Sequence, residues 1–370
     1  MSSTAALTRI SVLKFITIAV TSLLVLSGAG AVLFAWSGLY SVAASEGHLA
    51  IVDKFLRFGM QSSVRTNAYG IVAPDLTDPD LRSLGAAHYY GGCMPCHGAP
   101  GHAPNALFQQ SLPAPPDLHT ARETWRDREL FWLIKHGLKY TGMPGWNARD
   151  RDDEQWAVVA FLKSMPEMSK SEYEALALGN FTQERVANDE PSKSRAADIA
   201  LCARCHGDAR SAPISSLVPK LSGQSEAYLL QALNDYAAGA RQSGIMQPIA
   251  STLSAQQKRA YAVYYAGQQQ RQKQGNGSGA TLAREGDAGR GIPACESCHG
   301  PERHETYPGL AGQSEKYLVS QLTLWRAGIP RTGPLAPVMM NVAAKLTDKE
   351  IRGLAEYYSA SQGVDNVGAR

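Results

Sequence analysis

The sequence has no cysteine outside three copies of one short pattern. Its six cysteines all fall in C-x-x-C-H, at residues 93–97, 202–206 and 295–299. A disulfide framework has no use for a histidine after every pair, and a thiol redox motif would sit near a β-α-β pattern, which is not visible here. A structural zinc site needs a second pair within about 20 residues. The pairs begin 109 and 93 residues apart, so none of these three chemistries fits.

Charge is scarce at the N-terminus. The net charge of the chain is only +3, and no block is basic enough to indicate binding to nucleic acid. No charged residue occurs from Phe15 to Ser45, a run longer than the roughly 20 residues that span a membrane. Because Arg9 and Lys14 precede this run, residues 1–14 are predicted to be cytoplasmic and the rest of the chain external. A long signal peptide cleaved near Ala44 is the alternative.

The pattern C-x-x-C-H is the attachment signature of c-type haem. Two thiols on one helical turn can reach the two vinyl groups of a porphyrin, and the histidine then lies under the iron as an axial ligand. In bacteria this attachment occurs outside the cytoplasm, in agreement with the predicted topology. The sequence therefore predicts three covalently bound haem c groups, attached through Cys93, Cys96 and His97; Cys202, Cys205 and His206; and Cys295, Cys298 and His299.

An internal repeat surrounds the second and third signatures. Residues 216–229 match residues 305–318, and residues 245–267 match residues 338–360. A methionine follows the first cysteine of each signature by 44 residues in both copies. This spacing indicates one module used twice.

The periodicity predicts short helices throughout and hence an all-α fold, with one N-terminal transmembrane helix followed by three small helical domains, one for each signature. Helices are expected near 79–90, over 127–142 and over 152–165. Apolar stripes predict two more helices, which carry Tyr228, Leu229, Leu233 and Tyr236 in one copy and Tyr317, Leu318, Leu322 and Trp325 in the other. Capping boxes, Ser254 with Gln257 and Thr347 with Glu350, begin the last helix of each copy. Residues 165–195 and 267–283 are expected to be linkers, the second of them flexible.

The predicted organisation has five parts. They are a cytoplasmic tip and transmembrane anchor (1–45), an amphipathic connecting segment (46–75), and cytochrome c domains 1 (76–180), 2 (190–270) and 3 (280–365). Ile51, Phe55, Phe58 and Met60 suggest that the connecting segment is an amphipathic helix, which rests on a membrane surface or docks a partner subunit.

These motifs resemble known families. Each signature segment is similar to a class I cytochrome c domain, and residues 195–270 and 285–362 resemble the halves of tandem dihaem cytochromes c, with "PKLSGQ" and "PGLAGQ". Residues 80–178, with "FWLIKHGLKYTGMPGW", look like the haem domain in subunits of periplasmic dehydrogenases. The whole chain resembles membrane-anchored trihaem cytochrome c subunits of such dehydrogenases, including molybdenum hydroxylase and alcohol or aldehyde types.

Each signature segment also offers a methionine as the second axial ligand. Met143, Met246 and Met339 each lie between the helices that follow a signature, so we expect them to ligate iron opposite His97, His206 and His299. Met340 is the alternative to Met339, and His136 is the strongest rival to Met143. The remaining histidines are further rivals, namely His48, His88, His102, His119 and His304.

The family resemblance adds a second contact for each signature histidine. It implies that the carbonyls of Pro219 and Pro308 accept a hydrogen bond from the ring, which fixes its orientation. In the first segment the choice stays open, because Pro113 begins the run "PAPP".

The leading functional hypothesis is a non-catalytic electron-transfer subunit of an oxidoreductase complex. It would be a single-pass protein of the bacterial cytoplasmic membrane with its haem domains in the periplasm. It would carry electrons from periplasmic dehydrogenase subunits to quinone, a soluble cytochrome or a terminal oxidase of the respiratory chain. A haem enzyme, either a peroxidase or a sulphur-compound dehydrogenase, is the alternative. A methionine candidate for every haem argues against it, because catalysis needs an open axial position.

Overall fold

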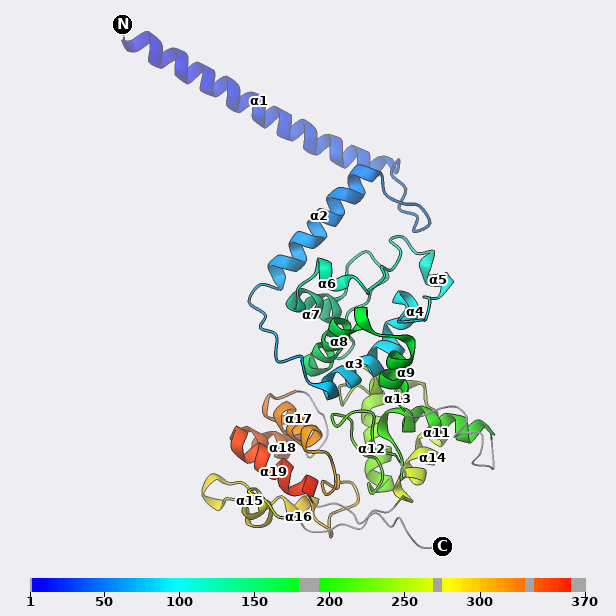
Figure 1. The fold of residues 1–370 in the computed structure, drawn as a ribbon. Helices are drawn as coiled ribbons and strands as arrows, with labels where there is room; N and C mark the ends of the chain where they lie inside the picture. The colour runs from blue at the N-terminus through cyan, green and yellow to red at the C-terminus, as the bar shows by residue number, and fades with distance from the viewer. Residues whose placement is uncertain (1, 180–192, 210, 269–274, 330–335, 361–370) are drawn as a thin grey trace. The chain divides into compact units, whose positions relative to one another are not determined.

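The computed structural model describes residues 2–179, 193–209, 211–268, 275–329 and 336–360. The described residues form helices and two isolated β-bridges, so the predicted all-α fold is confirmed. The chain divides into two compact units (Figure 1). The first comprises residues 1–56 with 111–113, and the second comprises residues 57–110 and 114–370.

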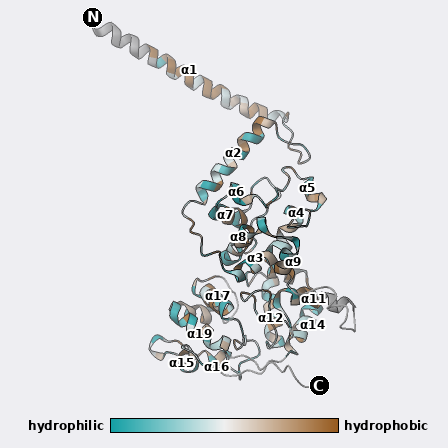
Figure 2. Ribbon diagram, in the orientation of Figure 1, coloured by the Kyte–Doolittle hydropathy of each residue, from teal (hydrophilic) through white to brown (hydrophobic). Residues whose placement is uncertain are grey.

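The first unit contains α1, Ser2–Ser37. Within it, Lys14–Ser37 is the single helical stretch of the described residues that is long and apolar enough to cross a membrane. Its apolar character stands out in Figure 2. The predicted N-terminal apolar helix is therefore present, although a signal sequence would have the same length and composition.

The predicted amphipathic helix is α2, Ala50–Asn67, which begins in the first unit and continues into the second. Phe55 and Phe58 are exposed by 71% and 69%. Further along the chain, Val64 in this helix and Ala68 directly after it are buried. The C-terminal end of this helix therefore contributes side chains to the folded core.

The first signature lies among helices of the second unit. These are α3 (Pro79–Gly92), α4 (Met94–His97), α5 (Ala106–Gln109), α6 (Ala121–Thr124), α7 (Asp127–His136), α8 (Asp152–Ser164), the 3₁₀ helix η1 (Met165–Glu167) and α9 (Lys170–Leu178). Helix α3 begins where the Asp78 side chain accepts the Asp80 N–H and Pro79 occupies the first turn. It packs along α8, with Tyr89 and Phe161 fully buried between them.

The predicted helix over 127–142 is too long, because α7 ends at His136. Gly137 has φ 64°, and a Cβ there would lie 2.5 Å from the Gly145 backbone nitrogen. Only glycine tolerates this conformation and this close approach. The chain then folds back, and the Trp146 N–H donates to the Lys135 carbonyl at 3.1 Å. The loop that carries Met143 is therefore tied to the end of α7.

The predicted linker over 165–195 is partly wrong. Ser169 and Glu172 form a capping box at the start of α9, and this helix packs on α3. Its Tyr173 is fully buried, and the hydroxyl donates to the Met94 sulphur at 3.4 Å. Residues 180–192 of that linker lie outside the described residues.

The two repeat copies have matching helices. The second signature lies on α11 (Lys193–His206), followed by α12 (Glu226–Ala237), α13 (Met246–Thr252) and α14 (Ala255–Ala266). The third lies on α16 (Glu296–His299), after α15 (Ala280–Glu285) and the 3₁₀ helix η2 (Ala288–Arg290), and before α17 (Glu315–Arg326), α18 (Ala336–Ala344) and α19 (Asp348–Ala360). Both predicted capping boxes are confirmed by reciprocal hydrogen bonds.

The second predicted linker, 267–283, is also partly wrong. Its last residues belong to α15, and Ala283 is completely buried against α19. Residues 269–274 lie outside the described residues. A small residue in a polar, glycine-rich stretch gave no sequence pattern from which this contact could be predicted.

Each signature has its own hydrophobic core. Cys93 packs against the cluster centred on Tyr89 and Phe161, Cys202 against the cluster of Leu229 and Tyr265, and Cys295 against the cluster of Leu354 and Tyr358. The described residues therefore form one core beside each C-x-x-C-H. The exact domain boundaries stay a prediction.

Candidate haem-binding sites

Each signature histidine has its ring fixed by a proline carbonyl. The Nδ1–H of His206 donates to Pro219 O at 2.9 Å, and that of His299 donates to Pro308 O at 2.9 Å. These are the two prolines that the family resemblance implied. A carbonyl can only accept, so the bonded tautomer carries its proton on Nδ1 and leaves the Nε2 lone pair for iron.

The first segment forms the same contact through one of the prolines among which the sequence left the choice open. His97 Nδ1 lies 2.8 Å from Pro116 O, so the last proline of the "PAPP" run takes this place rather than Pro113. Burial lowers the pKa of His206 and His299, against the opposing effect of their proline carbonyls. Both rings are therefore neutral near pH 7, which is the form that binds a metal.

The cysteine environment argues against thiol redox chemistry. All six cysteines are free of disulfides. Burial raises the pKa of Cys93 to about 12 and that of Cys295 to about 11. Reactive cysteines have a lowered pKa instead. These thiols suit stable attachment of a group better than exchange reactions.

A large, mainly apolar cavity of about 1390 Å³ reaches all three signatures. All six signature cysteines and all three signature histidines line it. The two predicted apolar stripes line it as well, from α12 with Tyr228, Leu229, Leu233 and Tyr236 and from α17 with Tyr317, Leu318, Leu322 and Trp325. A porphyrin needs such an apolar slot beside its attachment residues, so the residues present fit haem c.

The candidate methionine ligands differ in whether they line this cavity. Met143, Met246 and Met339 all line it, whereas Met340 is not among the lining residues. Met340 instead has its methyl group 3.9 Å from a Cβ built at Gly328. This arrangement favours Met339 as the third methionine ligand.

The histidine rivals have other contacts. His136 is exposed and its ring packs on Trp132 at 4.9 Å. His102 contacts Glu174, His119 contacts Asp117, His304 contacts Thr306 and His48 contacts Tyr40. His88 differs, because it is 4% exposed and lines the cavity, with its ring 5.3 Å from that of Trp146. Burial lowers the pKa of His88, so its ring is neutral.

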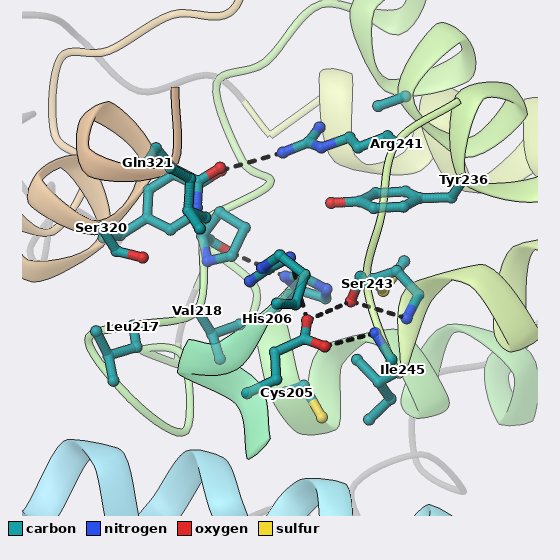
Figure 3. Close-up of a pocket in the computed structure, with 18 of the residues that line it drawn as sticks. Cys205, His206, Leu217, Val218, Tyr236, Arg241, Ser243, Ile245, Ser320 and Gln321 are labelled. Carbon is teal, nitrogen blue, oxygen red and sulfur yellow. Dashed lines mark hydrogen bonds and ion pairs between the residues drawn. The ribbon is translucent and has the colours of Figure 1, made fainter. Parts of the chain in front are cut away.

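Arg241 places a cation at the cavity, and the sequence gave no sign of it. Its guanidinium lies 4.7 Å from the centre of the Tyr236 ring and donates to the hydroxyls of Tyr228, at 3.3 Å, and Tyr317, at 3.5 Å. Figure 3 shows this guanidinium pointing toward Gln321, on the same side as the Tyr236 ring. A guanidinium at this cavity suits an anionic group such as a haem propionate, because charge-assisted hydrogen bonds to an anion are the strong ones.

Two buried glutamines join the repeat copies reciprocally. The Gln224 amide accepts the Gly309 N–H at 2.9 Å and donates to the Gly309 carbonyl at 2.8 Å. Gln313 makes the matching pair with Lys220, at 3.0 and 2.7 Å. Each glutamine ends its own "PxLxGQ" run and binds the residue after the histidine-bonded proline of the other copy. The segments that carry the histidine-bonded prolines of the two copies are therefore held against each other.

Further contacts join the first signature segment to the other two. Ser215 and Ser216 donate to Asp80, and the Arg204 guanidinium lies 4.6 Å from the centre of the Tyr90 ring. From the third segment, Lys316 forms ion pairs with Asp78 and Asp80.

Comparisons with known proteins identify related sequences. Residues 81–162 match the family model described as cytochrome c oxidase, cbb3-type, subunit III. The thiosulfate dehydrogenase electron acceptor of Stutzerimonas stutzeri is 36% identical, over 43% of this chain and 77% of its own length. Cytochrome c4 of Pseudomonas aeruginosa is 33% identical, over 44% of this chain and 84% of its own. The solved structure of reduced cytochrome c4 from Pseudomonas stutzeri is 32% identical, with a TM-score of 0.41, and covers 47% of this chain and all of that one.

The chain belongs to the cytochrome c4 family of multi-haem class I cytochromes c. It is a c-type cytochrome that carries electrons through covalently bound haem. Each of these relatives covers less than half of the chain.

The reciprocal glutamines give a crossed prediction. Gln224→Ala leaves the buried Gly309 N–H and carbonyl without partners, so we expect a loss of about 2 kcal/mol in the free energy of unfolding. Hydrogen exchange should accelerate at Gly309, in the other copy, and Gln313→Ala should accelerate it at Lys220. The exposed Gln256 on α14 provides the control, and Gln256→Ala should change neither site. Faster exchange confined to the mutated copy would contradict the reciprocal contact.

Proposed function

We propose that this protein is a membrane-anchored trihaem cytochrome c that carries electrons from a periplasmic dehydrogenase to the respiratory chain. One observation carries the proposal. In every signature segment a histidine gives its Nδ1–H to a proline carbonyl, and a methionine of the same segment lines the same cavity. Haem c would supply one-electron redox chemistry at each of these places. The chain supplies attachment, two axial ligands and an apolar surrounding.

The residues have distinct roles in this proposal. The three cysteine pairs hold the groups covalently, and His97, His206 and His299 bind from the proximal side. Met143, Met246 and Met339 would complete the coordination, which would close each iron to substrates and raise its potential. A closed iron suits a carrier rather than a peroxidase or a sulphur-compound dehydrogenase.

The partner is proposed from the relatives. The Stutzerimonas relative is named as the electron acceptor of a thiosulfate dehydrogenase, and a second such acceptor, from Thiomonas intermedia, is 35% identical over 79% of its length. We infer a dehydrogenase as the electron donor of this chain, with thiosulfate as the first substrate to test. The match of residues 81–162 to an oxidase subunit family supports a place in a respiratory chain, with quinone, a soluble cytochrome or a terminal oxidase as acceptor.

Replacing the methionines tests the closed sites. Met143→Ala, Met246→Ala and Met339→Ala should each remove about one third of the far-red sulphur-to-iron absorption, because each opens one iron. The reduced variants should each bind about one carbon monoxide per chain, whereas the wild-type protein should bind none. Met340→Ala is the matched control and should behave as wild type. A wild-type protein with a high-spin iron that binds carbon monoxide would favour a haem enzyme instead.

The anchor is tested by mass. We expect membrane-extracted protein to retain residues 15–45, because the charge-free run is longer than the core of a signal peptide. Intact-mass spectrometry after detergent extraction measures this directly. A soluble protein whose mature N-terminus lies near Ser45 would show a cleaved signal and a freely diffusing carrier.

A further inference from the structure

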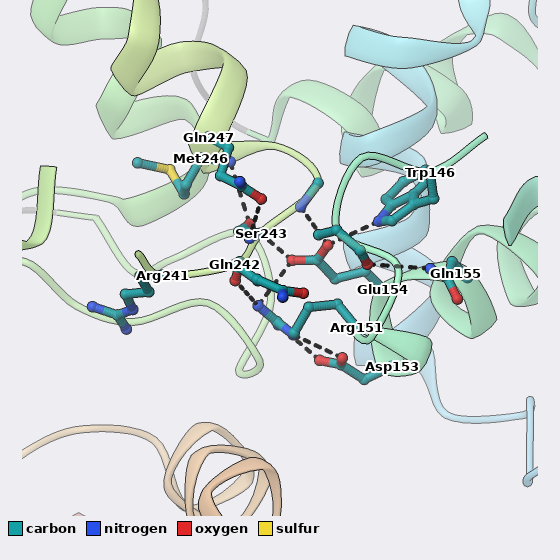
Figure 4. Close-up of polar contacts among 12 residues, drawn as sticks. Trp146, Arg151, Asp153, Glu154, Gln155, Arg241, Gln242, Ser243, Met246 and Gln247 are labelled. Carbon is teal, nitrogen blue, oxygen red and sulfur yellow. Dashed lines mark hydrogen bonds and ion pairs between the residues drawn. The ribbon is translucent and has the colours of Figure 1, made fainter. Parts of the chain in front are cut away.

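A buried carboxylate occupies the junction between the first and second signature segments. Glu154, in the first turn of α8, is 2% exposed. Its Oε1 accepts the Ser243 hydroxyl at 2.8 Å and lies 3.1 Å from the Arg151 guanidinium. Its Oε2 accepts the Gly244 N–H at 2.6 Å and the Trp146 indole N–H at 3.1 Å. Figure 4 shows these donors converging from both segments.

The donors of this carboxylate come from the two methionine loops. Trp146 lies three residues after Met143, and Ser243 lies three residues before Met246. The Ser243 hydroxyl also accepts the Met246 N–H at 3.2 Å. One hydroxyl therefore connects Glu154 directly to the backbone of a predicted iron ligand. A carboxylate with four donors is fully satisfied, which a buried charge requires.

The fit around Glu154 is close. A Cβ added at Gly244 would lie 2.4 Å from the Trp146 ring, so the indole rests directly on the backbone of the second segment. Arg151 reinforces the contact, because it donates to the Gln242 carbonyl at 2.8 Å while Asp153 holds its other nitrogens at 2.8 and 2.9 Å. The 242–244 backbone is thereby held by side chains of residues 146–154.

The middle segment uses different sides toward its two neighbours. It meets the third segment through the residues that follow the histidine-bonded prolines, Lys220 and Gly309. It meets the first segment through the loops that carry the methionines and, at a second place, through Arg204 and Ser215. The Met246 loop therefore contacts the first segment, whereas Lys220 contacts the third.

We propose that Glu154 is a positioning residue for electron exchange between the first and second haem sites. It locks the Met143 and Met246 loops together and so fixes the separation across which the electron passes. One electron leaves a ferrous site and reduces a ferric one, and no bond or proton is exchanged. The inference rests on the proposed function, because it takes both methionines as ligands.

The test uses the full-length, haem-loaded protein in detergent. Glu154→Gln keeps the shape of the side chain but removes its charge. It also replaces one accepting oxygen by an amide NH₂ group, which then faces hydrogen-bond donors. Because losing hydrogen bonds to this buried charge loosens the contact between the two loops, we expect the rate of exchange between the two sites to fall well below that of wild type. Pulse radiolysis with less than one electron per chain measures this rate. Hydrogen exchange at residues 243–247 should accelerate in parallel.

A matched control separates positioning from general stability. Glu129 is also buried in the first segment, at 4% exposure, but it accepts the Arg126 N–H at the start of α7. Glu129→Gln should destabilise the first segment and leave the exchange rate within twofold of wild type. Gly244→Ala, whose methyl group collides with the Trp146 ring, should reproduce the slow exchange without altering any carboxylate. If Glu154→Gln does not fold, the exchange rate of Gly244→Ala tests the positioning role instead.

The outcomes distinguish the two proposals. If Glu154→Gln or Gly244→Ala exchanges electrons as fast as wild type while keeping three methionine-ligated irons, the positioning role is overturned and the proposed function stands. If the wild-type protein itself lacks methionine-ligated low-spin sites at 143 and 246, the proposed function fails first. Slow exchange in both variants together with normal exchange in Glu129→Gln supports the role of Glu154.

Discussion

The hydrogen bond from a signature histidine to a proline carbonyl is the contact on which the rest of the arrangement depends. It fixes the tautomer and the plane of His97, His206 and His299 and leaves Nε2 of each ring free to bind iron in the proposed haem sites. The two thiols of the same helical turn can then reach only one region of space. In the second and third copies, the residue after that proline is also the one bound by the glutamine of the neighbouring copy. The same short segment thereby orients a ligand and joins two sites.

The junction between the first and second segments has a different physical basis. There the contact is electrostatic and buried, with one carboxylate, Glu154, surrounded by donors from both sides. Removing one partner of such a cluster leaves a buried charge or donor unpaired, which costs more than the contact contributed. The chain therefore connects its sites through two kinds of interface, one built from amide pairs with the backbone and one from a buried charge.

The chemistry of the sites could be predicted from local patterns. The signatures, the repeat, the capping boxes and the stripes on α12 and α17 all depend on residues a few positions apart, and such spacings are visible in one sequence. The resemblance to tandem dihaem cytochromes c added Pro219 and Pro308. It left the first segment open, because three prolines within four residues give no local reason to choose Pro116.

The contacts between segments could not be predicted in this way. Glu154 and Ser243 are 89 residues apart, and Gln224 and Gly309 are 85 apart, and no periodicity links such positions. A glutamate in the first turn of a helix normally faces solvent and stabilises the helix dipole, so burial of Glu154 runs against the local expectation. Helix α9 did have a local signal, the capping box of Ser169 with Glu172, whereas the packing of Tyr173 on α3 and Met94 is decided by residues distant in the sequence.

The most direct measurement is the number of haem groups and electrons per chain. Fully matured protein should keep its haem through acid-acetone extraction, give the pyridine haemochrome spectrum of c-type haem and contain three irons. An anaerobic reductive titration should then take up three electrons per chain, with every iron low-spin. Two or fewer covalent haems in matured protein, or uptake of fewer than three electrons, would contradict the account.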